Sequence, residues 1–301
     1  MTIALLDGDI IAYTGAILGE DRCPFGGEPA LDRVAAFKGV NDMVERWRYE
    51  AQAKDVIVVL SGKDNFRMDV LPTYKQNRAG KEKPALYNDV VNFIEEKFRT
   101  IRKPRLEADD TLGILGTSDP KKYVVVSADK DMRTLPCRVI IPGKMPIPIH
   151  FREWEANRFW MTQTLTGDTV DGYGGCPKIG PVKAERILDG LWKLPDLWSA
   201  VVDTYKAAGL TEADALVQAR VARILRNSDF DRETREIKLW APRATLSERL
   251  PTEPPLYQPQ PTSSPKTSSS SKPNEGSSSP APRKSKPIKK RGSRKPKPTT
   301  E

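Results

Sequence analysis

The sequence predicts an α/β fold in its N-terminal half, with a mostly parallel sheet covered by helices on both faces, followed by a small all-helical region. Three apolar runs with β-branched residues, 3–6, 55–60 and 121–127, are typical of buried parallel strands. Stretches with helical spacing lie between these runs, and the strand signals stop after about residue 152. The chain therefore combines an α/β region with a helical one.

Each further element has its own signal. In residues 33–53 and 88–99 apolar side chains recur at three- and four-residue spacing, which predicts helices. Short strands or a β-ribbon are expected at 138–141 and 147–149. Thr211 has the position of an N-cap, with acids in the turn that follows it. The helical stretches of the second region are 154–165, 181–188, 197–208 and 211–226.

Composition sets the domain boundaries. We expect an α/β domain in residues 1–151, a helical domain in 152–250 and a tail in 251–301. The tail is rich in Ser, Pro and Lys and has few large apolar residues, so it is expected to be disordered. Residues 262–301 carry eleven Lys or Arg against two acids, which equals the whole net charge of +9. Such a tail suits either polyanion binding or a protein partner.

Several classes of protein are excluded by composition. No apolar run approaches the roughly 20 residues of a membrane helix, and the N-terminus lacks the pattern of a signal peptide, so we expect a cytoplasmic protein without a membrane partner. The three cysteines form no CxxC pair, which argues against a disulfide framework or a zinc ribbon. The single histidine, His150, excludes paired-His metal sites.

Acidic residues cluster beside the predicted strands. Asp7 and Asp9 follow the first strand, and Asp129 and Asp131 follow the third. The acidic motif EADD at residues 107–110 precedes a helical stretch. In open α/β sheets the functional crevice lies at the carboxyl ends of the strands. Each group alone is also explained by helix capping or a turn, but together they are expected to converge on one crevice.

Two more acids, Asp168 and Asp171, precede a glycine-punctuated hairpin at residues 175–183 that opens a predicted helix. Such a hairpin points backbone N–H groups at a phosphate. Converging carboxylates need cations, because like charges raise one another's pKa. Oxygen ligands without His or Cys indicate Mg²⁺ or Mn²⁺. Two ions about 3.5–4 Å apart would activate water and stabilise the leaving oxygen of a phosphodiester.

A basic segment follows the second predicted strand. It carries Arg67, Lys75 and Arg78, with Tyr74 among them. Overhanging the crevice, the cations would stabilise charge on the scissile phosphate, and Tyr74 would suit stacking on an unpaired base. The alternative interpretation is a solvated charged loop.

Taken together, these motifs resemble the 5′-nuclease (flap endonuclease) superfamily, and within it the 5′→3′ exonucleases of T7-like phages. The correspondence runs from residue 3 to about residue 240 and leaves out the tail. It implies a PIN-like (resolvase-like) domain with a helical arch near residues 64–84, followed by a helix-three-turn-helix domain. The motifs that carry it, in order, are LLDGD at 5–9, NFR and YKQNR within 65–78, LEADD at 106–110, VVSADKD at 125–131, and GDTVDGYGG from 167 into the helix-hairpin-helix loop.

The resemblance also implies residue roles. It assigns a first metal ion to Asp7, Glu107, Asp109 and Asp110, and a second to Asp129, Asp131, Asp168 and Asp171. The expected catalytic residues are Lys75, Arg78, Asp109 and Asp129. The expected DNA-binding residues are Arg67, Tyr74, Lys75, Arg78, Gly175, Lys178, Gly180 and Lys183, with K⁺ at the hairpin.

One position departs from the family pattern. Many members have an acid directly after the second strand, where this chain has Ser61 and Gly62. Asp64 lies close behind and is a candidate replacement.

The predicted function is a Mg²⁺-dependent 5′→3′ exodeoxyribonuclease that degrades duplex DNA from 5′ ends by a two-metal mechanism. The resemblance adds flap cleavage, removal of RNA primers from RNA–DNA hybrids, and a phage protein in the host cytoplasm. Replication proteins are candidate partners of the tail. The alternatives are a structure-specific 5′ flap endonuclease, an inactive nuclease-derived DNA-binding module and a PIN-type ribonuclease. The nearly full set of acids argues against the inactive module, and the duplex-binding hairpin argues against the ribonuclease.

Overall fold

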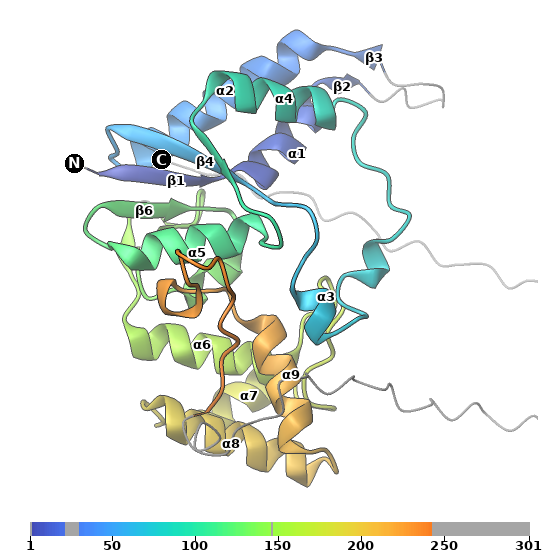
Figure 1. Cartoon of the computed structure of the whole chain (residues 1–301), viewed down its shortest axis with the longest axis vertical. Helices are drawn as coiled ribbons and strands as arrows, with labels where there is room; N and C mark the ends of the chain where they lie inside the picture. The colour runs from blue at the N-terminus through green and yellow to red at the C-terminus, as the bar shows by residue number, and fades with distance from the viewer. Residues whose placement is uncertain (1, 22–29, 146, 243–301) are drawn as a thin grey trace, which may run out of the picture. The chain divides into compact units, whose positions relative to one another are not determined.

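A six-stranded sheet organises the part of the chain that the computed structural model describes, residues 2–21, 30–145 and 147–242 (Figure 1). Its strands are β1 (Ile3–Asp7), β4 (Asp55–Leu60), β5 (Thr100–Arg102), β6 (Tyr123–Val126), β7 (Arg138–Ile140) and β8 (Ile149–His150). Their order is β5-β4-β1-β6-β7-β8, and all neighbours are parallel except the antiparallel pair β7 and β8. The predicted mostly parallel sheet is confirmed, and β5 is an addition to it.

Helices cover both faces of this sheet, as the sequence predicts. On one face lie α1 (Gly8–Leu18), α2 (Arg33–Glu50) and α4 (Tyr87–Lys97), and on the other lies α5 (Ala108–Ser118) (Figure 1). The strand side chains alternate between two cores: Leu6 and Val58 pack with the first group of helices, whereas Leu5 and Val59 pack with α5. A separate antiparallel pair joins β2 (Glu20–Asp21) to β3 (Ala30–Leu31).

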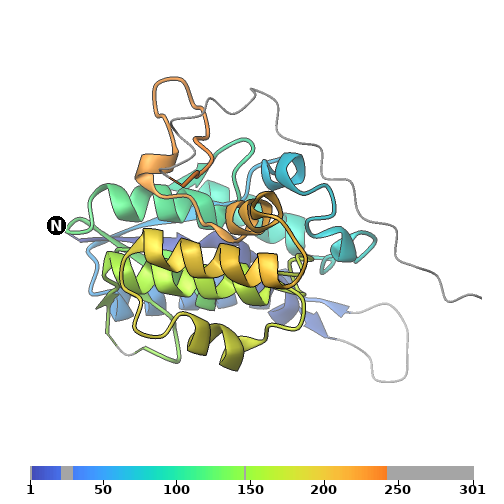
Figure 2. The same ribbon diagram turned by 90° about the horizontal axis from the view of Figure 1, so that it is seen from below.

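The second region is helical. It contains α6 (Glu153–Thr166), α7 (Pro181–Ile187), α8 (Leu194–Ala207) and α9 (Glu212–Ala222), and Figure 2 shows α6 and α8 side by side. The fully buried Trp160 is central, because its indole N–H donates to the Ala219 carbonyl at 2.8 Å and its ring meets Trp240 edge to face. The same apolar cluster includes Phe66 and Leu106 from the α/β region.

Two of the predicted helices are too long. The stretch 33–53 ends as a helix at Glu50, and the stretch 211–226 ends at Ala222. Arg223 adopts extended backbone angles, and the Leu225 N–H then donates to a carboxylate oxygen of Asp110 on α5 at 3.1 Å. The chain therefore leaves the helix in order to pack on the α/β region.

The predicted tail, 251–301, lies outside the described residues, and the boundary at residue 151 stays a prediction. Within the described ranges, no helix is long and apolar enough to cross a membrane.

Candidate active site

A cavity of about 200 Å³ opens at the carboxyl ends of β1, β4 and β6. The structure thus brings together acids and cations that lie far apart in the sequence. The charged and polar side chains that line the cavity are Asp7, Asp9, Ser61, Lys75, Arg78, Glu107, Asp109, Asp129 and Asp171.

Asp7 stands at the base of this cavity. It ends β1 and caps α1, where its carboxylate accepts hydrogen bonds from the Ile10 N–H at 3.2 Å and the Ser127 hydroxyl at 2.6 Å. The next residue must be glycine, since a Cβ on Gly8 would lie 2.6 Å from the Val59 carbonyl oxygen. This close turn fixes the Asp7 carboxylate against the sheet.

The carboxylates raise one another's pKa. Burial, opposed in part by the Ser127 hydrogen bond and reinforced by nearby carboxylates, raises the pKa of Asp7 to about 7. Burial and the charges of Asp7, Asp129 and Glu107 hold the pKa of Asp109 well above its usual range. An arrangement that disfavours its own ionised form gains from added positive charge.

Protein cations supply part of that charge. Lys75 forms ion pairs with Glu107 and, at 3.7 Å, with Asp171, and Arg78 pairs with Asp171 at 2.6 Å. Burial raises the pKa of Glu107, but the charges of Arg67 and Lys75 outweigh it and lower the pKa to about 2. Among the residues described, no group of three His, Cys, Asp or Glu side chains is already gathered in the arrangement of a metal site.

Arg67 has a different place from the one predicted. Its motif predicts a DNA contact, but its side chain is 3% exposed and its guanidinium donates to both oxygens of Asp110 at 2.7 and 2.8 Å. It also donates to the carbonyls of Val221 and Arg223 at 2.9 and 2.7 Å. Burial in this network makes Arg67 unavailable to DNA.

Asp110 is likewise removed from the predicted metal site. Its side chain is fully buried and does not line the cavity. Its oxygens are used by Arg67 and by backbone N–H groups of Glu107 and Leu225. Asp110 therefore holds the start of α5 against the chain that follows α9.

We expect Arg67→Ala to lower the free energy of unfolding by about 3–5 kcal/mol, because it leaves the buried Asp110 carboxylate unpaired. Chemical denaturation measures this loss. The matched control is Arg33→Ala, which breaks an exposed pair with Asp89 and is expected to cost at most about 1 kcal/mol. Equal losses in the two variants would contradict the structural role of Arg67.

Tyr74 also turns inward. It is 3% exposed, so the stacking on an unpaired base that the sequence suggests has no accessible ring face. Its hydroxyl donates to Glu107 at 2.9 Å and lies 3.3 Å from an oxygen of Asp171. Tyr74 orients these two carboxylates at the cavity.

Asp131 and Asp168 lie beside the cavity and are bridged by a lysine that sequence reasoning missed. The Lys130 amine contacts Asp131 at 2.9 Å and Asp168 at 3.1 Å. Burial and the charge of Asp129 raise the pKa of Asp131 to about 6. The signal in the sequence was the lysine between two acids in the DKD motif.

Asp9 lines the cavity, as the predicted convergence of acids indicates, but the sequence assigned no role to it or to its partner Ser61. Asp9 accepts hydrogen bonds from the Ser61 hydroxyl and, at 3.1 Å, from the Ser61 N–H, and the Ser61 hydroxyl accepts the Ala108 N–H at 2.9 Å. This chain of bonds ties the start of α1 to the chain after β4 and to the start of α5. Asp64 is exposed and lies outside the cavity lining, so it does not replace the family acid. The signal was the second aspartate of the DGD motif.

The chain that leads into the hairpin before α7 is joined to the basic segment at Asp171. The backbone N–H of Lys75 donates to the Asp171 carbonyl at 2.8 Å. Gly175 has φ of 63°, and a Cβ there would lie 2.2 Å from the Gly167 nitrogen. The predicted DNA contacts Lys178, Gly180 and Lys183 are all exposed. The hairpin therefore presents these residues on the surface at a fixed place relative to Asp171.

Comparisons with known proteins find similarity to 5′-3′ exonucleases. Residues 2–142 match the family described as 5′-3′ exonuclease, N-terminal resolvase-like domain. The chain is 26% identical over 283 residues to an exodeoxyribonuclease of Enterobacteria phage T3, covering 80% of this chain and 93% of that one. It is 25% identical over 280 residues to an exonuclease of Escherichia phage T7, with the same shares.

Solved structures show the same fold. The T5 5′-exonuclease with bound zinc matches with a TM-score of 0.57 and 16% identity, over 74% of this chain and 89% of that one. A complex of the T5 flap endonuclease with DNA and metal ions matches with a TM-score of 0.54 and 16% identity, over the same 74% and 89%. The predicted resolvase-like fold is confirmed.

Proposed function

We propose that this protein is a Mg²⁺-dependent 5′→3′ exodeoxyribonuclease acting from the 5′ ends of duplex DNA, because residues 2–142 match the family of 5′-3′ exonuclease N-terminal resolvase-like domains and the chain is similar to two phage exonucleases. The observation that carries the proposal is one cavity in which Asp7, Glu107, Asp109 and Asp129 meet Lys75. Acids of this kind at the carboxyl ends of parallel strands suit a reaction on a phosphate.

The donor set fits divalent ions. The carboxylates offer hard oxygen ligands. Burial and the neighbouring carboxylates raise the pKa of Asp7 and of Asp109, so added positive charge would favour their ionised forms. Two Mg²⁺ or Mn²⁺ ions, when bound, would activate water and neutralise charge on the leaving oxygen. In this proposal Asp7, Glu107 and Asp109 hold the first ion, without Asp110. The second belongs to Asp129, Asp131, Asp168 and Asp171.

We expect the metal-free protein to lose stability as the pH rises from about 4 to about 7. The pKa of Asp7 is raised from 3.8 to about 7 and that of Asp131 to about 6, so the folded state keeps protons that the unfolded state releases. Stability is full below the unfolded value and is lost as the pH rises through the folded values, on the order of a few kcal/mol in total.

Thermal melts in EDTA across this pH range measure the effect. Melts with Mg²⁺ should show a smaller loss, because the cation favours the ionised carboxylates. A melting temperature in EDTA that stays constant or rises with pH would contradict the crowding of these acids.

Lys75 and Arg78 would bind the scissile phosphate. Both reach the cavity, where they pair with Glu107 and Asp171. A phosphate that enters would compete for the same cations, and their fixed positive charge would stabilise the charge that develops during cleavage.

The hairpin would hold the duplex. Lys178, Gly180 and Lys183 are exposed and are joined through Asp171 to the basic segment, so duplex backbone bound there would be placed relative to the cavity. K⁺ at this hairpin is part of the proposal. The T5 flap endonuclease complex with DNA and metal ions supports DNA and divalent ions as ligands of this fold.

Flap cleavage and removal of RNA from RNA–DNA hybrids are proposed as further activities of the same site. A structure-specific 5′ flap endonuclease is the second candidate, favoured by the structural match to the T5 flap endonuclease. The similarity to phage enzymes supports action in the host cytoplasm. Contacts with replication proteins through residues 251–301 are proposed from the composition of the tail.

The deciding experiment is digestion of duplexes labelled at the 5′ or the 3′ end, and of a 5′ flap, with Mg²⁺ and with EDTA. Early release of labelled 5′ mononucleotides or short oligonucleotides, only with Mg²⁺, is the expected result. Cutting confined to the flap junction would establish the second candidate instead. DNA binding without any cleavage would overturn both.

A further inference from the structure

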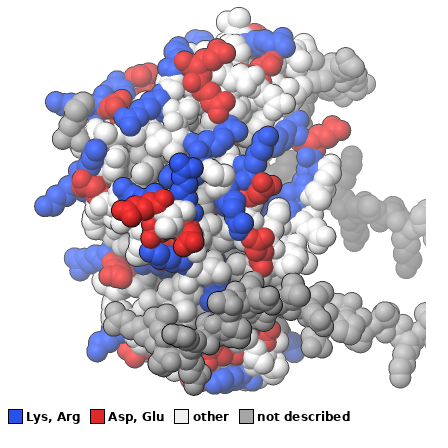
Figure 3. Space-filling view, in the orientation of Figure 1, with Lys and Arg blue, Asp and Glu red and all other residues white. Residues whose placement is uncertain are grey.

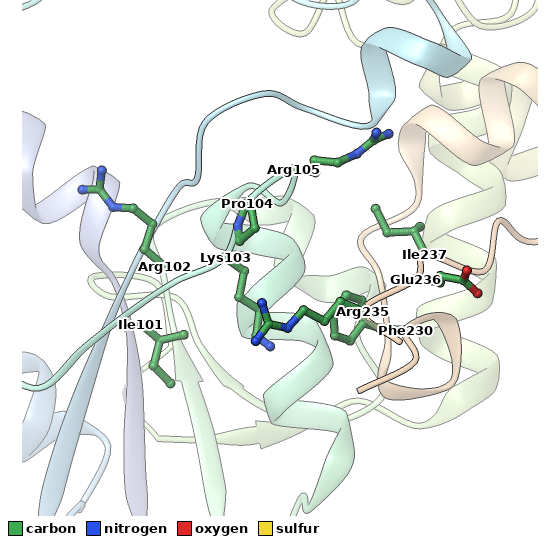
Figure 4. Close-up of a pocket in the computed structure, with 9 residues that line it drawn as sticks. All are labelled: Ile101, Arg102, Lys103, Pro104, Arg105, Phe230, Arg235, Glu236 and Ile237. Carbon is green, nitrogen blue, oxygen red and sulfur yellow. The ribbon is translucent and has the colours of Figure 1, made fainter. Parts of the chain in front are cut away.

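A second cavity, of about 810 Å³, lies between the segment that follows β5 and the segment that follows η3 (Asn227–Asp229). Four cations and one acid line it. Arg102 ends β5, Lys103 and Arg105 follow in the first segment, and Arg235 and Glu236 belong to the second. In Figure 4 the side chains of Lys103 and Arg235 extend toward each other beside Phe230, while those of Arg102 and Arg105 point away from them. We call this the basic pocket.

Two of the four cations are neutralised. Arg102 pairs with Glu95 at 3.1 Å, and Arg105 pairs with Asp69. The face in Figure 3 carries Lys and Arg side chains with Asp and Glu side chains among them.

Lys103 and Arg235 have no ion-pair partner in the part of the chain that the structure describes. The Lys103 amine lies over the Phe230 ring at 4.8 Å from its centre. Partial burial and the positive charges of Arg232 and Arg235 lower the pKa of Lys103. The pocket therefore holds like charges close together, and its acid, Glu236, forms no ion pair with Lys103 or Arg235 in the described part of the chain. An anion would relieve this arrangement.

The shape of the pocket is built into the backbone. Arg105 and Arg235 have φ of 64° and 62°, in the left-handed region that non-glycine residues rarely adopt. The first turn is fixed by hydrogen bonds to the segment after β4, where the Arg105 N–H donates to the Lys63 carbonyl at 2.9 Å. A Cβ on Gly62 would lie 1.9 Å from the Lys103 carbonyl oxygen. Gly62 is one of the two residues found where many family members have an acid. Its lack of a side chain leaves room for the Lys103 carbonyl beside the pocket.

The pocket and the active-site cavity are linked by a short piece of chain. Glu107 comes four positions after Lys103 in the chain, a span of at most about 14 Å even when fully extended. That is roughly four nucleotides of B-DNA at about 3.4 Å each. A DNA strand with one phosphate in the active site therefore has others within reach of the basic pocket.

We propose that the basic pocket binds phosphate groups of the DNA substrate, at a place distinct from the active site and the hairpin. The inference rests on the proposed function. The ligand is a phosphate rather than a base, because Phe230 is only 7% exposed and offers no stacking face. The volume admits a sugar–phosphate segment, which a simple ion site would not need.

The test measures DNA binding by the full chain in EDTA, by fluorescence anisotropy at several salt concentrations. The pocket variant is Lys103→Gln with Arg235→Gln. The control is Lys54→Gln with Lys121→Gln, which changes the charge by the same amount. These two exposed lysines lie before β4 and β6, at the amino ends of the strands and so at the opposite end from the active-site cavity. The pocket variant should bind about 3- to 10-fold more weakly, and its slope of log affinity against log salt should fall by about 1–2.

The pocket variant should also melt at the same temperature as wild type or higher, because the substitutions remove repulsion. Weaker binding with unchanged stability would support the proposal. Equal shifts in pocket variant and control would overturn it, since the effect would then be one of total charge. A third measurement is titration of wild type and the pocket variant with inorganic phosphate. If wild type binds phosphate and the pocket variant does not, while both have the same slope of log DNA affinity against log salt, the pocket binds phosphate but DNA is not its ligand, and the proposal is overturned.

The two proposals fail in different ways. If wild type neither binds nor cleaves DNA, the proposed function fails. If wild type binds and cleaves but the pocket variant matches the control, only the basic pocket is overturned.

Discussion

Asp109→Asn is expected to abolish cleavage while leaving DNA binding in EDTA largely intact. Asp109 lines the cavity between Asp7, Glu107 and Asp129, whose charges contribute to its raised pKa. Loss of this carboxylate removes a proposed ligand of the first metal ion. The fall in rate should exceed the roughly 10²–10³-fold cost of losing one preorganised electrostatic contact.

Stability separates this role from a structural one. Within the described residues the Asp109 carboxylate makes no hydrogen bond or ion pair, so its replacement by the isosteric amide breaks none. Because its ionised form is disfavoured by burial and by the neighbouring acids, the variant should melt in EDTA at the wild-type temperature or above. A large drop in melting temperature would show that lost folding explains lost activity.

Asp64→Asn is the matched control. Asp64 follows β4, as the missing family acid would, but it is exposed and outside the cavity. Its replacement should leave the rate within about twofold of wild type, as for an ordinary surface change. Asp129→Asn should behave like Asp109→Asn, although Asp129 also caps the turn at Asp131 through a 2.8 Å hydrogen bond. Full activity in both cavity variants would refute the site.

The sheet could be predicted because its signal is local. Runs such as residues 55–60 are apolar throughout, and in the structure Val58 and Val59 of β4 serve cores on opposite faces. Parallel strands then place Asp7 and Asp129 at one edge by topology alone. The convergence of acids therefore follows from strand order, which a sequence pattern can indicate.

The inward or outward direction of single charges could not be predicted. Arg67 and Arg78 stand in one basic segment, yet Arg67 is 3% exposed and Arg78 lines the cavity. The difference arises because Val221 and Arg223, more than 150 positions later in the chain, supply carbonyl acceptors to Arg67. Burial of a charge depends on partners of this kind, and periodicity does not contain them.

What stands in for the family acid after β4 could not be predicted for the same reason, because it depends on contacts with distant parts of the chain. From the sequence, an acid nearby at Asp64 was the natural replacement. The structure fills the space with Ser61, whose hydroxyl is held by Asp9 and accepts the Ala108 N–H. Gly62 is explained by the Lys103 carbonyl, which leaves no room for a side chain. Both explanations need contacts between segments 40 or more residues apart.

Lys75→Met is the second substitution with a large expected effect. It should lower kcat by about 10²–10³-fold, the usual cost of removing one preorganised charge at a reacting group. Lys75 is held at the cavity by Glu107 and Asp171, and their charges raise its pKa against the effect of burial, so it stays cationic at neutral pH. Its charge is therefore available to a phosphate throughout the working pH range.

Kinetics on a 5′-labelled duplex with Mg²⁺ measures this loss, and anisotropy in EDTA measures binding separately. Lys81→Met is the control, because Lys81 is exposed in the same basic segment and lies outside the cavity lining. If Lys75 acts on the charge that develops during cleavage, kcat falls while affinity changes by less than about tenfold. If it acts only in binding, KM rises, kcat is kept, and the proposed role at the scissile phosphate is wrong. Lys75→Arg should recover part of the rate, since it restores the charge but not the compact ammonium that fits between Glu107 and Asp171.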